Sequence, residues 1–120
     1  DHGFSTYANT IEVSNRLIKE NPDLIKRFIS ASRLGWQDYL ASDPQPAFDL
    51  IQQLNPDMPS EKLNYAREKM IEYNIVTGDN QKIGSMSADR WREFYKMSLE
   101  LGIYESEFDH EKAYTLEFSN

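Results

Sequence analysis

The sequence predicts a mostly α-helical chain with one or two strands. Apolar residues recur every three to four positions over several stretches, which is the period of an amphipathic helix. Only Tyr7–Val13 mixes β-branched and polar residues with the short alternation that is typical of a strand. Because a lone strand cannot complete its own hydrogen-bond ladder, the helices are expected either to cover one another or to cover a sheet supplied from outside this chain.

The composition narrows the function classes. The 120 residues include 20 acidic and 13 basic side chains, a formal net charge of -7, which disfavours nucleic acid as a partner. There are no cysteines, so disulfides and thiolate metal sites are excluded. No apolar run approaches the roughly 20 residues that span a bilayer. No signal peptide is visible, and this gives no evidence for the cytosol.

The strongest local signals begin the first two helices. Ser14 or Asn15 can cap a short helix that runs to Glu20. Asn21-Pro22-Asp23 then combines an N-cap, a proline suited to the first helical position and an acid that complements the helix dipole. Asp43-Pro44 is expected to end this long helix, because the residue before proline avoids the helical region.

Two adjoining rows of the long helix are expected to form a broad buried face. One row is Leu24, Phe28, Ala31, Gly35 and Tyr39, and the other is Ile25, Ile29, Ser32, Trp36 and Leu40. The tryptophans Trp36 and Trp91 share such rows with other apolar residues, so core packing is expected for both.

Four further helices are expected. They span roughly 46–54, 60–74, 87–101 with Ser87 as cap and Gly102 as stop, and a short last one from Asp109 through Tyr114. Their inward residues are expected to be Ala47, Leu50, Ile51 and Leu54, then Leu63, Ala66, Met70 and Tyr73, then Trp91, Phe94, Tyr95, Ser98 and Leu101.

Two phrases carry a family resemblance. The first is ENPDLIKRFISASRLGWQDYL at 20–40, followed by Asp43-Pro44 and by AFDLI at 47–51. The second is GSMSADRWREF at 84–94, followed by Leu101-Gly102-Ile103 and by an ending with Tyr114 and Phe118. Together they resemble the NMT1/THI5-like periplasmic substrate-binding proteins, a family that includes the pyrimidine-precursor binders of thiamine transport. The resemblance covers roughly residues 7–118.

The resemblance implies that this chain is the C-terminal part of a longer α/β protein with two lobes, of the type II periplasmic-binding-protein class. Residues 1–13 would be the hinge-return strand region, and residues 14–120 the helical C-terminal part of the substrate-binding domain. The longer protein would capture a small organic molecule, such as a thiamine-pyrimidine precursor, and deliver it to an ABC permease. It would be periplasmic, or extracellular and anchored to the membrane as a lipoprotein.

The same resemblance suggests ligand contacts near the beginning of the chain. Tyr7 and Asn9 lie where the returning segment of the family passes the cleft, and Phe4 is a weaker candidate. A flat ring can stack on a heteroaromatic ligand, and an amide can donate and accept at once. The structural alternative is a buried tyrosine and a turn asparagine. No catalytic residue and no cofactor are expected, and His2 and His110 lack the spacing of metal ligands.

Two other functions stay open at this point. The helices could form an autonomous bundle that binds another protein, and surfaces left uncovered would then favour self-association of the chain. The fungal branch of the family resembles a pyrimidine synthase that uses its own histidine as a substrate and carries a cysteine-rich motif. This chain has no cysteine, and neither histidine lies in a comparable phrase, so the expected function is binding and not catalysis.

Overall fold

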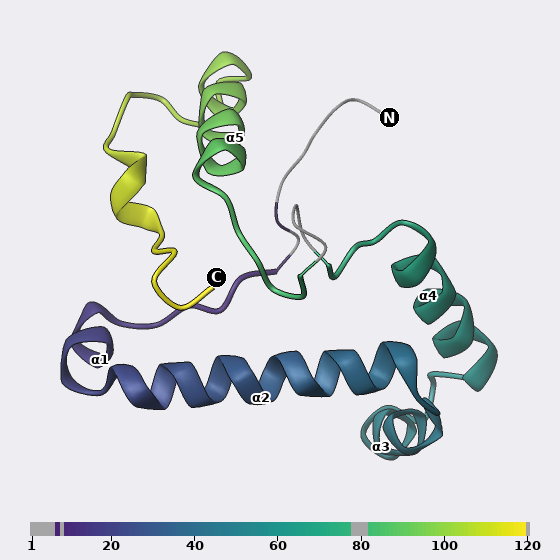
Figure 1. The fold of residues 1–120 in the computed structure, drawn as a ribbon. Coiled ribbons are helices and arrows are strands. Elements are labelled where there is room, and N and C mark those ends of the chain that lie inside the picture. Colours follow the sequence, from purple (N-terminus) through teal and green to yellow (C-terminus); the bar gives the residue numbers. More distant parts are fainter. Residues whose placement is uncertain (1–6, 8, 78–81, 120) are drawn as a thin grey trace. The chain divides into compact units, whose positions relative to one another are not determined.

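The computed structural model describes residue 7 and residues 9–77 and 82–119, and helices dominate them (Figure 1). The elements are α1 (Asn15–Glu20), α2 (Pro22–Ala41), α3 (Gln45–Leu54), α4 (Ser60–Glu72), α5 (Ala88–Glu100) and the 3-10 helix η1 (His110–Ala113). None of these helices has the length and apolar character that crossing a membrane requires.

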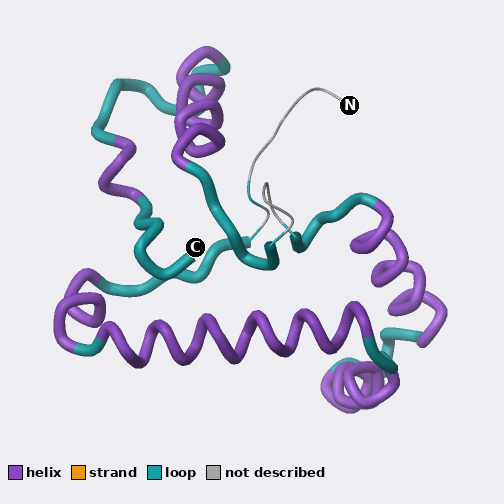
Figure 2. The backbone as a smooth tube through the Cα atoms, in the orientation of Figure 1, coloured by secondary structure: helices purple, strands orange, loops and turns teal. Residues whose placement is uncertain are grey.

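The strand predicted over Tyr7–Val13 is not formed by the residues that the structure describes there. Residues 7 and 9–13 have no regular secondary structure, and the described parts of the chain are helix and loop throughout (Figure 2). The physical reason is the one that limits any isolated strand: no second strand is present among the described residues to accept its hydrogen bonds. The prediction of a mostly helical chain is confirmed.

Caps fix the beginnings of α1 and α2 as predicted. The Ser14 hydroxyl accepts a hydrogen bond from the Leu17 backbone N–H at 3.2 Å. The Asn21 side-chain oxygen accepts one from Leu24 N–H, also at 3.2 Å, immediately before Pro22 opens α2. Each cap satisfies a donor that the first helical turn would otherwise leave unpaired.

Left-handed residues follow the ends of α4 and α5. Asn74 has φ 52°, so α4 ends at Glu72, two residues earlier than predicted. Gly102 has φ 68° and follows Leu101, the C-cap of α5, as the sequence predicts. The short polar side chain of asparagine tolerates this conformation, and it serves here as glycine does elsewhere.

The chain divides into two compact units, each described separately below. Unit 1 comprises residues 1–26 and 86–120, and unit 2 comprises residues 27–85. The sequence-based division into a hinge-return region at 1–13 and a helical part at 14–120 follows a different criterion and stays a prediction.

The centre of unit 2 is Phe48 of α3, which is only 1% exposed. Tyr39 of α2 meets its ring edge-on with 6.2 Å between centroids. The Arg67 side chain of α4 donates hydrogen bonds to the carbonyls of Tyr39 at 2.8 Å and Leu40 at 2.7 Å, and to that of Ser42 at 3.3 Å. Arg67 therefore supplies partners for the last carbonyls of α2, which no intrahelical N–H can reach.

The predicted buried faces of unit 2 are partly wrong. Phe48, which the sequence analysis did not assign to the core, is buried, whereas Leu50 and Leu54 of the same helix are exposed. In α2, Ile29, Ser32 and Leu40 are half-buried, but Phe28 of the other row is exposed. Periodicity shows that a helix is amphipathic, but how much of its apolar face is covered depends on which neighbours the described chain supplies.

Unit 1 packs around a small set of buried residues that come from distant parts of the sequence. Ile25 at the beginning of α2 is 3% exposed, Ser98 of α5 is fully buried, and Phe118 near the C-terminus is buried as well. Leu101, predicted to face inward, is exposed just beyond the end of α5. Unit 1 thereby holds the segment of Tyr7, helix α5 and the C-terminal tail in one body.

Candidate functional site

Four side chains of unit 1 form an aromatic and cationic cluster, which we call the Trp91 cluster: Tyr7, Arg90, Trp91 and Tyr114. Trp91 and Tyr114 are stacked, with ring centroids 5.1 Å apart and planes within 3° of parallel. The Tyr7 ring lies 5.4 Å from the Trp91 ring at a tilt of 42°. The Arg90 guanidinium lies over the Tyr7 ring, 4.4 Å from its centroid, which is the geometry of a cation–π contact.

Tyr7 also contacts the first turn of α5 through its hydroxyl. The backbone N–H of Ser87, the N-cap residue, donates to the Tyr7 hydroxyl at 2.8 Å. The Ser87 hydroxyl in turn accepts from Arg90 N–H at 3.3 Å. Ring and hydroxyl together hold the Tyr7 segment on the beginning of α5, so the structural alternative for this tyrosine has direct geometric support.

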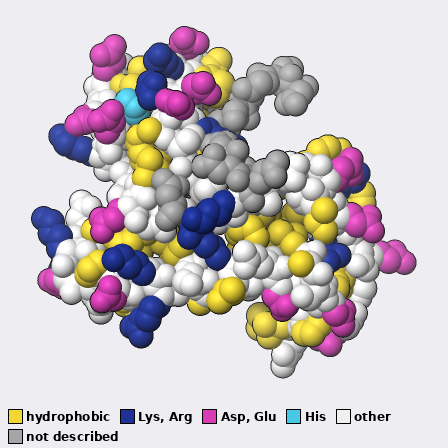
Figure 3. Space-filling view, in the orientation of Figure 1, with side chains coloured by type: hydrophobic (Ala, Val, Ile, Leu, Met, Phe, Trp, Pro, Cys, Tyr) yellow, Lys and Arg dark blue, Asp and Glu magenta, His cyan; other side chains and the backbone are white. Residues whose placement is uncertain are grey.

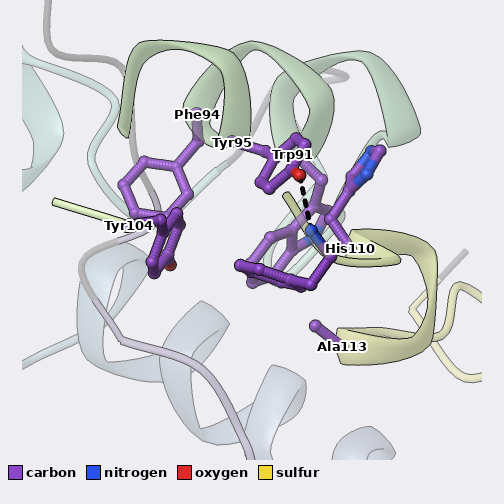
Figure 4. A pocket seen from close by; sticks show the side chains of 7 residues that line it. Trp91, Phe94, Tyr95, Tyr104, His110 and Ala113 are labelled. Carbon is purple, nitrogen blue, oxygen red and sulfur yellow. Dashed lines mark hydrogen bonds between the residues drawn. The ribbon is translucent and has the colours of Figure 1, made fainter. Parts of the chain in front are cut away.

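A second aromatic group adjoins the cluster and forms a pocket, which we call the His110 pocket (Figure 4). It is lined by Trp91, Phe94, Tyr95, Tyr104, Phe108, His110 and Ala113. The imidazole of His110 stacks on Tyr95 with centroids 4.4 Å apart, and the Tyr95 hydroxyl accepts a hydrogen bond from Phe108 N–H at 2.9 Å (dashed in Figure 4). Its cavity of about 30 Å³ has room for a water molecule, but not for a ring-shaped ligand.

Charged side chains surround the pocket. Figure 3 shows acidic side chains, with basic ones among them, over the part of the molecule that carries α5 and η1. Beside His110, a hydrogen bond from the Lys112 ammonium lowers the pKa of the Asp109 carboxyl, and their charged atoms lie 3.0 Å apart. The carboxylate of Asp109 is therefore held in its ionised form at the N-terminal end of η1.

The three residues predicted to contact a ligand differ in how exposed they are and in whether the structure describes them. Tyr7 belongs to the Trp91 cluster and is half-buried, whereas Asn9 is exposed. Phe4 lies outside the described residues. Neither Tyr7 nor Asn9 lines the His110 pocket, and the contact of all three predicted residues with a ligand stays a prediction.

Core packing was predicted for both tryptophans, and for Trp36 the prediction is wrong. Trp36 meets Tyr39 edge-on at 5.9 Å in unit 2, but it is 39% exposed, because the described neighbours cover only one side of its ring. Trp91 is half-buried in the Trp91 cluster. Within the part of the chain that the structure describes, no three His, Asp or Glu side chains gather closely enough to hold a metal ion.

Sequence reasoning missed the stacking partners. His110 was weighed only as a metal ligand, and Tyr114 only as part of the last helix and of the family ending. The available signal was the density of aromatic residues: those between residues 91 and 114 are Trp91, Phe94, Tyr95, Tyr104, Phe108 and Tyr114. Such density predicts a cluster, but it does not predict which rings stack.

Comparison with known proteins confirms the family resemblance over the first part of the chain, whereas the phrase at 84–94 lies outside the family match. The family model described as NMT1/THI5 like matches residues 1–47. These residues include the segment of Tyr7, helix α1 and all of α2. No solved structure gives a significant match.

A curated relative extends the match along the chain. Riboflavin-binding protein RibY of Chloroflexus aurantiacus is 32% identical over 120 residues, an alignment that covers 96% of this chain and 34% of the relative. The chain thus spans about a third of the length of the relative it matches. The chain is therefore similar, along nearly all of its length, to part of a protein named for binding a small molecule.

Proposed function

We propose that this chain is the C-terminal part of a solute-binding protein that captures a small heteroaromatic molecule for uptake. One observation carries the proposal: 96% of the chain aligns at 32% identity with a relative named for riboflavin binding. The NMT1/THI5-like match over residues 1–47 supports the same class of protein. Binding by this class needs no catalytic residue, and the relative's name favours a non-enzymatic role.

The ligand that we propose has a flat ring with polar substituents. A thiamine-pyrimidine precursor and riboflavin share this chemistry, since both carry ring nitrogens that can accept hydrogen bonds from a cleft. The relative's name makes riboflavin the first ligand to test. Tyr7, Asn9 and Phe4 are the residues of this chain that we propose to contact it.

The mechanism that we propose is closure of two lobes on the ligand, followed by delivery to an ABC permease. A ligand that contacts both lobes stabilises the closed state by its differential affinity for that state, and the permease recognises closure. We propose accordingly that the protein acts outside the cytoplasm, as a periplasmic protein or as an extracellular lipoprotein anchored to the membrane. No bond is made or broken in this cycle.

Titration of the complete protein that contains this chain tests the proposal. Riboflavin fluorescence should be quenched with a Kd in the micromolar range or below, about -8 kcal/mol or more favourable. Tyr7→Ala should weaken binding at least about tenfold if its ring contacts the ligand, while Tyr7→Phe and the exposed Tyr65→Ala should not. Absence of saturable binding of both riboflavin and a hydroxymethylpyrimidine would refute the proposal.

A further inference from the structure

Helix α2 has an apolar face that the described chain leaves uncovered. Phe28 is 57% exposed and Leu34 is 63% exposed, and the small residues Ala31 and Gly35 are exposed beside them. We call these four residues the Gly35 face. Figure 3 shows hydrophobic side chains open to the surface along the part of the chain that contains α2 and α3. An uncovered apolar face of this kind marks a surface that another element covers.

The glycine is unexplained by the described chain itself. Gly35 lies in the interior of a 20-residue helix, where glycine is less favourable than alanine. Apart from its chain neighbours and the nearby backbone of α2 itself, a Cβ built on Gly35 would meet no described atom within 4 Å. Gly35 also has no positive φ that would call for glycine. A close approach by an element beyond the described residues would give a structural reason for a residue without a side chain.

We propose that the Gly35 face is the surface on which the remainder of the longer protein docks, through an apolar element whose backbone approaches α2 closely at Ala31 and Gly35. The inference rests on the proposed function in one respect, the existence of that longer protein. The chain corresponds to 34% of its relative, so roughly two thirds of the relative's length lies outside the match and can supply the element. An element in the same polypeptide is favoured over a second copy because its effective concentration is far higher.

Single cysteines test the docking directly, because the chain has none of its own. Ala31→Cys places a thiol on the Gly35 face. Gln37→Cys is the matched control, since Gln37 is exposed, lies on the opposite side of the helix from Gly35 and is about a third of a turn away from Ala31, beyond the Leu34 edge of the face. In the complete protein, the thiol at position 31 should react with a maleimide at least about tenfold more slowly than the thiol at 37. In the isolated chain the two should react at similar rates.

A second variant gives a readout that does not depend on thiol chemistry. Gly35→Ala should raise the Tm of the isolated chain by a few degrees, since alanine favours the helix and the methyl group meets no described atom. In the complete protein the same variant should lower the Tm, because the methyl group would enter a packed contact.

The outcomes separate the proposals. Equal labelling at 31 and 37 in the complete protein, or a reading frame with no further domain beside this chain, would overturn the docking proposal. Protection at 31 that depends on protein concentration would assign the face to a second copy and overturn it too. Neither readout uses a ligand, so protection at 31 in a protein that binds no riboflavin would refute the proposed function alone.

Discussion

Ser98 shows how one atom can lower the stability of unit 1. The residue is fully buried in the last turn of α5, and its hydroxyl has no hydrogen-bond partner among the described residues. Burying a hydroxyl without a partner costs about 1–3 kcal/mol in mutational data. Ser98 is therefore a position at which removing a polar atom should help the fold.

We expect Ser98→Ala to raise the free energy of unfolding of unit 1 by about 1 kcal/mol, because the unpaired hydroxyl is removed and alanine favours the helix. Urea unfolding followed by tryptophan fluorescence measures this. Unit 1 contains Trp91 and unit 2 contains Trp36, so a Trp36→Phe background makes the signal report on unit 1.

Ser32 of unit 2 provides the control for Ser98. Its hydroxyl donates to the Phe28 carbonyl at 2.9 Å, so it is already paired. A Trp91→Phe background leaves Trp36 as the reporter of unit 2. In that background, Ser32→Ala should change the free energy of unfolding of unit 2 by less than about 0.5 kcal/mol. Destabilisation by Ser98→Ala would show that the hydroxyl has a partner.

Asp109 carries the pH dependence that the structure resolves. Its pKa is lowered by the hydrogen bond from Lys112, so the folded pKa lies below the unfolded one. The stabilisation is therefore fully present above the unfolded pKa of about 3.9, and it is lost as the pH falls through the folded value. NMR titration of the Asp109 carboxyl carbon should give a midpoint below that of an ordinary aspartate, and Lys112→Met should move it upward. An unchanged midpoint in Lys112→Met would exclude Lys112 as the cause.

At the scale of elements, Arg67 joins α4 to the end of α2. Its guanidinium donates to the carbonyls of Tyr39 and Leu40 in the last turn of α2 and to that of Ser42 just after it, and this last turn has no basic residue of its own. The positive charge also complements the negative end of the helix dipole. One side chain therefore fixes where α4 lies relative to α2 within unit 2.

Two substitutions of Arg67 should separate the contribution of its positive charge from that of its planar hydrogen-bonding geometry. Arg67→Met should lower the free energy of unfolding of unit 2 by about 1 kcal/mol, because two half-buried carbonyls and an exposed one lose charge-assisted partners. Arg67→Lys should recover part of this loss, since an ammonium keeps the charge but cannot reproduce the planar fork. Unfolding followed at Trp36 measures the change, with the exposed Arg27→Met as control, for which a change within about 0.5 kcal/mol is expected.

The secondary-structure elements show which parts of the fold can be predicted from the sequence. Local signals predicted the beginnings of α1, α2 and α5 correctly, because an N-cap or a proline acts within a few residues. The stacking of Trp91 on Tyr114 and the hydrogen bonds from Arg67 to the end of α2 join residues far apart in sequence, and no local pattern predicts such contacts. The strand at Tyr7–Val13 was wrong for the described residues there because strand pattern alone supplies no ladder partner.

At the scale of the whole molecule, the described chain covers few of its apolar side chains. Buried hydrophobic residues are limited to Ile25, Phe48, Leu63 and Phe118 among those described. Large apolar residues are exposed in both units, including Leu54 in unit 2 at 80% and Leu101 in unit 1. This balance agrees with a chain that corresponds to about a third of its relative and whose helices have further surface to cover.

The same balance predicts weak ligand binding by the isolated chain. The His110 pocket of about 30 Å³ cannot enclose a heteroaromatic ring, and lobe closure needs contacts from a part of the cleft that we place outside this chain. We expect a Kd for riboflavin of about 1 mM or weaker, against micromolar or tighter for the complete protein, a difference of at least about 4 kcal/mol. Calorimetry on both proteins measures it, with a hydroxymethylpyrimidine as second ligand. Micromolar binding by the isolated chain would mean that it holds a complete site of its own, and the two-lobed mechanism would then have to be abandoned.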